Sequence, residues 1–146
     1  IHLATHGLLD NFVERVPGAL ALSPDTATSK NKPNEGLLKA TEIINLDINA
    51  NLVVLSACDT GRGKITSDGV IGLSRALITA GTPSVIVSLW SVPDAPTAEL
   101  MTEFYRQLKL TGDKAQSLRH AMLKLKKKYP DTPRKWAAFT LIGEAD

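Results

Sequence analysis

One cysteine, Cys58, and a histidine followed by glycine, His6-Gly7, are the residues of this sequence best suited to nucleophilic catalysis. A thiol with a pKa of about 8.5 is mostly protonated at neutral pH and needs a nearby base to become a good nucleophile. Imidazole is the usual base because it titrates near physiological pH. The backbone amides of Gly7 and Cys58 are candidate donors to the oxyanion that would form during attack on a carbonyl.

Other interpretations of the same residues stay open. A lone cysteine is often inert packing, and a lone histidine is often a hydrogen-bonded structural residue. A metal site built from His2, His6 and Cys58 lacks the Cys-x-x-Cys or His-Glu-x-x-His spacing of known sites. Gly61 and Gly63 could belong to a phosphate-binding loop, but two glycines without the rest of the motif are weak evidence for one. We therefore expect no metal and no cofactor, and we interpret His2 as a structural residue on a strand.

The elements that must position these residues are visible as apolar runs alternating with helical patterns. Strands are predicted at 1–5, ending in a turn at Gly7, and at 52–55, 84–90 and 136–143, with a further strand resuming at 36–38 after an exposed loop over 22–36. Helices are predicted from Ser67 or Asp68 to Gly81, over 97–110 and over 114–129, with a helical turn capped by Thr41. The predicted buried helix positions are Val70, Ile71, Leu73, Leu77, Ile78, Leu100, Met101, Phe104, Tyr105, Leu108, Leu118, Ala121, Met122 and Leu125.

Strands alternating with helices indicate an α/β protein with a largely parallel sheet covered on both faces. In such sheets, functional sites form at the carboxyl ends of the strands. His6 follows the first predicted strand, Cys58 the second and Asp94 the third. Adjacent parallel strands would bring His6 and Cys58 together.

Composition limits the class of protein. The chain has 146 residues, 43% of them apolar and 22% charged, which suits one globular domain. The formal net charge of +2 gives no reason to expect nucleic-acid or membrane partners. The single cysteine precludes a disulfide within the chain and fits a reducing, cytoplasmic setting. The lysines at 124 and 126–128 are interpreted as a solvated helix face.

Several stretches in order along the chain resemble the CHAT domain, a caspase-like module of the separase-related cysteine peptidases that is often fused to tetratricopeptide repeats. They are His2-Leu3-Ala4-Thr5-His6-Gly7, Leu52 to Gly61, Gly72 to Leu77, Ala80-Gly81, Ser84 to Asp94, Phe104-Tyr105-x-x-Leu108 and Trp136-Ala137-Ala138-Phe139.

The resemblance implies a three-layer α/β/α caspase-hemoglobinase-like fold, with His6 as general base and Cys58 as nucleophile of an endopeptidase. It also implies that Asp94, with Asp59 as a second candidate, binds a basic substrate side chain; the alternative for Asp94 is a helix cap. The partners implied are a peptide or protein substrate and a tetratricopeptide-repeat region that regulates the domain. A non-catalytic scaffold module is the alternative function. Because the chain begins inside a strand at Ile1, we interpret residues 1–146 as the dyad-bearing portion of one CHAT-like domain whose earlier strands are absent.

Overall fold

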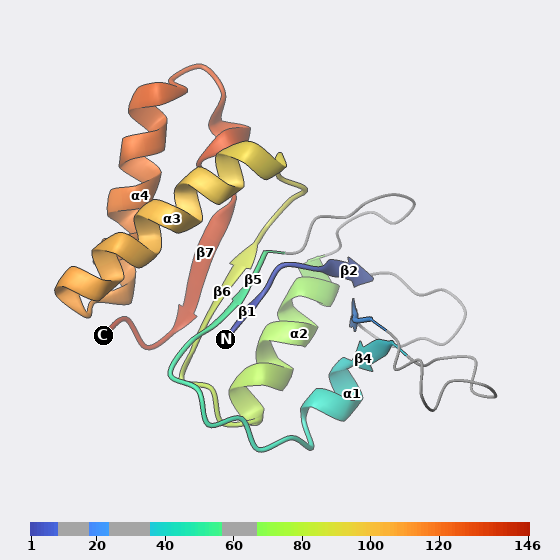
Figure 1. The fold of residues 1–146 in the computed structure, drawn as a ribbon. Coiled ribbons are helices and arrows are strands. Elements are labelled where there is room, and N and C mark those ends of the chain that lie inside the picture. The colour runs from blue at the N-terminus through green and yellow to red at the C-terminus, as the bar shows by residue number, and fades with distance from the viewer. Residues whose placement is uncertain (9–17, 24–35, 57–66) are drawn as a thin grey trace.

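The computed structural model describes residues 1–8, 18–23, 36–56 and 67–146, and the structural statements below concern these ranges (Figure 1). The elements in chain order are β1 (His2–Leu3), β2 (His6–Leu8), β3 (Ala19–Ala21), β4 (Leu37–Lys39), α1 (Ala40–Ile43), β5 (Val53–Leu55), α2 (Ser67–Thr79), β6 (Ser84–Ser88), α3 (Asp94–Thr111), α4 (Lys114–Lys128), a 3₁₀ turn (Pro133–Lys135) and β7 (Phe139–Gly143).

The main sheet has the strand order β1-β5-β6-β7. β1, β5 and β6 run parallel, and β7 is antiparallel to β6. Every residue of β5 and β6 is buried, as the uninterrupted apolar runs predict for strands covered on both faces. The prediction of a mostly parallel sheet is therefore confirmed.

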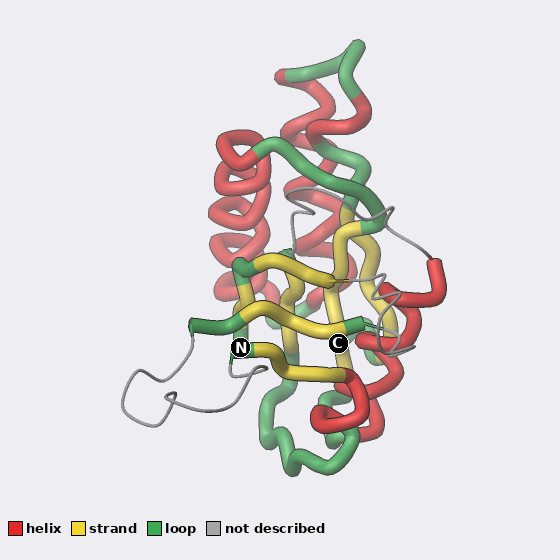
Figure 2. The backbone as a smooth tube through the Cα atoms, turned by 90° about the vertical axis from the view of Figure 1, so that its right-hand side faces the viewer, coloured by secondary structure: helices red, strands yellow, loops and turns green. Residues whose placement is uncertain are grey.

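Helices cover both faces of this sheet (Figure 1). Alternate residues of β5 face opposite ways: Val53 and Leu55 pack with α1 and α2, whereas Val54 packs with α3 and α4. Figure 2 shows the same strands, in yellow, between the helices. The architecture is thus the predicted three-layer α/β/α arrangement.

The strand predicted at 36–38 is confirmed as β4, but the second sheet that it forms, with the antiparallel order β2-β3-β4, was not predicted from the sequence. Gly7 lies inside β2, paired with Leu20, so the predicted turn at Gly7 is wrong. These strands have three residues each, too few for a periodic pattern. The fully buried Leu20 shows what holds the sheet in place, because its side chain joins the core beneath α2. Most of the predicted 22–36 loop lies outside the described residues.

Three elements begin at residues other than those predicted from the sequence: α3, α1 and β7. α3 begins at Asp94 and carries Pro96 in its first turn, where proline is tolerated, whereas the predicted start was Thr97. α1 begins at Ala40 with Thr41 inside it, so Thr41 is not the cap. The final strand begins at Phe139 because 133–135 form a 3₁₀ turn.

Three helical residues predicted to be buried are exposed. Ile71 and Ile78 on α2 are 43% and 39% exposed, and Tyr105 on α3 is 37% exposed. The buried stripe of α2 runs through the predicted Leu73 and Leu77 together with Ala76, a small residue that lets the helix lie close to the sheet. The spacing of apolar residues therefore predicted the helices correctly but placed residues at the margin of their buried faces that are in fact exposed.

Glu103 links α3 to α4. Its side chain is buried, and its carboxylate accepts hydrogen bonds from Arg106 Nη2 at 2.5 Å and from Lys124 Nζ at 2.6 Å. The hydrogen bond from Arg106, helped by those from Lys124 and Gln107, holds the pKa of Glu103 well below its usual range despite burial. Lys128 pairs with Glu99 at 2.7 Å in the same way. Two of the four clustered lysines therefore fasten the helix pair, and Lys126 and Lys127 form the predicted solvated face.

Two glycines with positive φ allow a matched test of the fold. Gly143 has φ +101°, and a Cβ there would collide with the Pro83 carbonyl oxygen; Gly112 has φ +75° and open space around the same position. We expect Gly112→Ala to lower the free energy of unfolding by about 1–2 kcal/mol, the cost of the left-handed backbone. Gly143→Ala should cost clearly more, about 3 kcal/mol or above, since backbone must also move. Urea unfolding followed by circular dichroism measures both, and equal losses would contradict the assigned end of β7.

Candidate active site

The carboxyl ends of β1 and β5 lie side by side. Leu3 is in register with Leu55, and the Ser56 amide donates to the Leu3 carbonyl at 3.1 Å. The chain therefore enters the His6 and Cys58 segments from neighbouring points on one sheet edge, as predicted for adjacent parallel strands.

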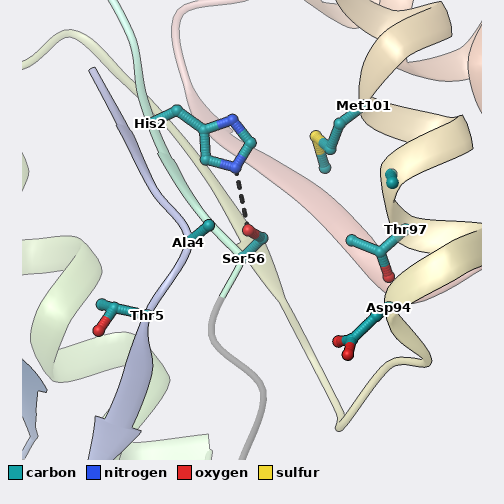
Figure 3. Close-up of a pocket in the computed structure, with 8 residues that line it drawn as sticks. His2, Ala4, Thr5, Ser56, Asp94, Thr97 and Met101 are labelled. Carbon is teal, nitrogen blue, oxygen red and sulfur yellow. Dashed lines mark hydrogen bonds between the residues drawn. The ribbon is translucent and has the colours of Figure 1, made fainter.

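A pocket of about 460 Å³ opens at this edge, between the two strand ends and the start of α3 (Figure 3). It is lined by His2, Ala4, Thr5, Ser56, Asp94, Thr97, Ala98 and Met101. Apolar groups of Ala4, Ala98 and Met101 form much of its wall. Such a chamber, mostly apolar with a few placed polar groups, is the usual form of a small-ligand or side-chain pocket.

Asp94 reaches this pocket from the first turn of α3. Its carboxylate is exposed and points toward the pocket in Figure 3. Pro93 occupies the N-cap position and no side chain caps the helix there. Asp94 thus lies where it complements the helix dipole and also where it faces the pocket, so both sequence interpretations fit its position.

His6 begins β2, and its backbone is in register with Ala21 of β3. Just before it, the Thr5 hydroxyl donates a hydrogen bond to the Ala21 carbonyl, which ties the link between β1 and β2 to the small sheet. Gly7 follows in β2 and is buried. The strand pairing therefore holds the backbone of both residues.

Cys58 and Asp59 lie outside the described residues. The structure brings Asp94 into one pocket with Thr5, the neighbour of His6, and with Ser56, two residues before Cys58. The dyad itself, its oxyanion donors Gly7 and Cys58, and the pocket role of Asp59 stay predictions.

His2 is the site residue that sequence reasoning missed. Its Nε2 lies 2.9 Å from Ser56 Oγ, and its Nδ1 lies 3.0 Å from the Tyr105 hydroxyl. Partial burial lowers the pKa of His2. Strand alternation offered a signal, because once β1 is paired in parallel with β5, His2 and Ser56 fall on the same face.

The described part of the chain contains no group of three or more histidine, cysteine, aspartate or glutamate side chains placed to hold a metal ion. None of its helices combines the length and apolar character needed to cross a membrane.

The sequence of this chain matches a known protein family and is similar to two curated proteins. The family model of the CHAT domain matches residues 1–144. Over 111 residues, 75% of this chain, the sequence is 41% identical to tetratricopeptide repeat protein 28 of Mus musculus. It is 40% identical over the same length to the Homo sapiens protein of that name. The match spans about 4% of the length of each of these relatives.

The lowered pKa of His2 predicts a pH dependence of stability. An unfolded histidine titrates near pH 6.5, whereas the folded His2 resists protonation, so folding should weaken as pH falls through about 6.5. His2→Gln removes this titration. We expect the urea midpoint to drop more between pH 7.5 and pH 5.5 in the wild type than in His2→Gln. An identical pH dependence in both proteins would contradict the assigned environment of His2.

Proposed function

Because this chain belongs to the CHAT family, a caspase-like and peptidase-related group, we propose that it is a cysteine endopeptidase acting through His6 and Cys58. The observation that carries the proposal is the parallel pairing of β1 with β5, next to a pocket that holds a carboxylate. This pairing gives the two dyad residues a common sheet edge.

The reaction follows from the chemistry of the two side chains. His6 takes the thiol proton of Cys58, and the thiolate sulfur attacks the scissile carbonyl carbon. The amides of Gly7 and Cys58 donate to the resulting oxyanion. Collapse breaks the C–N bond, His6 protonates the leaving amine, and a thioester remains on Cys58. Water, deprotonated by His6, then hydrolyses the thioester and releases the carboxylate product.

The pocket favours a substrate with a basic residue before the scissile bond. Asp94 supplies a negative charge at its mouth, and Ala98 and Met101 provide apolar wall for an aliphatic stem. A charge-assisted hydrogen bond from an arginine or lysine side chain to this carboxylate is stronger than a neutral hydrogen bond. We assign Asp59 as a second acceptor for the same side chain.

The setting of the activity is proposed from the relatives. Two relatives are named for tetratricopeptide repeats, which supports a repeat region in the same longer protein as this chain. Residues 1–146 would then be the dyad-bearing portion of its CHAT domain, regulated by that region or by a partner. We place the activity in the cytoplasm, with peptides or proteins as substrates and without nucleic-acid or membrane partners.

The first test of the proposal is replacement of the nucleophile. Cys58→Ala should lower kcat/KM for peptide-library cleavage by a factor of about 10³ or more, because the covalent route is lost. Thr102→Ala, on an exposed part of α3, serves as control and should keep full activity. Equal cleavage by Cys58→Ala and wild type would exclude this mechanism. A folded wild-type protein that cleaves nothing would favour the alternative, a non-catalytic scaffold module suggested by the repeat-protein relatives.

The second test concerns specificity. Asp94→Asn should lower kcat/KM for substrates with arginine or lysine before the scissile bond by about 10-fold to 100-fold, because an ionic hydrogen bond is lost. Substrates with norleucine in that place should be affected little. Asp131→Asn, in the exposed turn after α4, is the matched control. An equal loss on both substrate classes would assign Asp94 to the helix terminus alone.

A further inference from the structure

A chain of hydrogen bonds joins the three elements around the pocket: Ser56, at the end of β5, to His2 of β1, and His2 to Tyr105 of α3. We call these three residues the His2 clamp. Both ring nitrogens of His2 meet a hydroxyl, at 2.9 Å and 3.0 Å. Since each hydroxyl can donate or accept, either neutral tautomer of the ring satisfies both contacts.

Ser56 is held on two sides. Its amide donates to the Leu3 carbonyl at 3.1 Å while its hydroxyl meets the His2 ring, and its side chain is only 8% exposed. It is the last described residue of this segment, two positions before Cys58. Whatever fixes Ser56 therefore fixes the point from which the chain continues toward the proposed nucleophile.

Tyr105 anchors the other end of the clamp. Its ring lies edge-on to Phe104, which is fully buried, with centroids 5.0 Å apart. The same ring is 5.7 Å from the His2 ring. Because Asp94 begins the helix that carries Tyr105, the clamp also ties the position of the pocket carboxylate to β1.

The pairing of a serine hydroxyl with an imidazole also occurs where serine is the nucleophile. Here the group that orients the ring is a neutral phenol, and the hydroxyl is nearly buried. A neutral phenol stabilises an imidazolium less than a carboxylate does. The geometry therefore suits support of the site better than attack on a substrate.

We propose that His2 is a positioning residue for peptide hydrolysis, holding Ser56 and Tyr105 so that the ends of β1 and β5 and the start of α3 keep one geometry. This inference rests on the proposed function, because it assigns His2 a role in that reaction. In this role His2 acts through Ser56, whose hydroxyl lies 2.9 Å from its Nε2. Loss of such support lowers the rate of the chemical step more than it weakens substrate binding.

The test combines turnover with the reactivity of Cys58, which is the only cysteine in the sequence. We expect His2→Ala to lower kcat about 10-fold or more with KM nearly unchanged, and His2→Gln to recover most of the loss by bonding Ser56. Ser56→Ala should match His2→Ala, and the double variant should be no worse than either. Tyr105→Phe should lower kcat to a smaller extent.

Matched controls away from the pocket are His120→Gln and Tyr129→Phe, which should leave kcat unchanged.

Alkylation of Cys58 by iodoacetamide, followed from pH 5 to pH 9, reports on the clamp without requiring turnover. In His2→Ala, the rate at pH 7 should fall about threefold or more, because the thiol would lose its alignment with His6. An unchanged alkylation profile, additive effects of His2→Ala and Ser56→Ala, or no recovery in His2→Gln would each overturn the clamp. If the wild type cleaves no peptide but His2→Ala still slows the alkylation of Cys58, the clamp stands and the proposed function is excluded. Cleavage that survives Cys58→Ala but not Ser56→Ala would overturn both and identify Ser56 as nucleophile.

Discussion

Neighbouring parallel strands in a sheet end at the same edge of that sheet, and here those strands are β1 and β5. Their pairing is short, with His2 opposite Val54 and Leu3 opposite Leu55. Without it, the segments that continue toward His6 and Cys58 would not leave the sheet from neighbouring strand ends, because a long stretch of sequence separates them. The pairing also orients His2 and Ser56 toward the same face, so the clamp and the dyad depend on one contact. Backbone hydrogen bonds set this register, and the buried side chains of β5 lock it.

Packing on both sides keeps that edge in place. Small and aliphatic side chains of α2 cover one face, and α3 with α4 covers the other. The helix pair is joined by Leu100, Phe104, Leu118 and Ala121 in its core, and by the ion pair of Glu103 with Lys124 at its margin. Fixing α3 matters for the site, because this one rigid helix carries both Asp94 and Tyr105. A shift of α3 would therefore move the Asp94 carboxylate and at the same time break the contact between Tyr105 and His2.

The small β2-β3-β4 sheet changes how the proposed base is held. A histidine in a loop after a strand could adopt several backbone conformations, and restricting it to one of them costs conformational entropy. His6 instead opens a strand whose backbone pairs with Ala21, and Thr5 fastens the preceding link to the same residue. Leu20, fully buried against the core under α2, anchors this sheet to the rest of the protein. The proposed base and the oxyanion donor Gly7 thus sit on backbone that is already ordered.

The sequence by itself determined the layers, the buried strands β5 and β6, the helices α2, α3 and α4, the strand β7 and the three strand ends where chemistry was expected. Long apolar runs, helical spacing and glycine stops are local signals that survive in the folded chain. The tertiary structure alone decided the pairing of the small sheet, the start of α3 at Asp94, the exposed positions of Ile71, Ile78 and Tyr105, and the contacts of His2 with Ser56 and Tyr105. Each of these features depends on which distant segment of the chain packs against it. A three-residue strand is too short to show a periodic pattern. A histidine on β1 has hydrogen-bond partners only because β5 and α3 pack beside that strand in the folded protein.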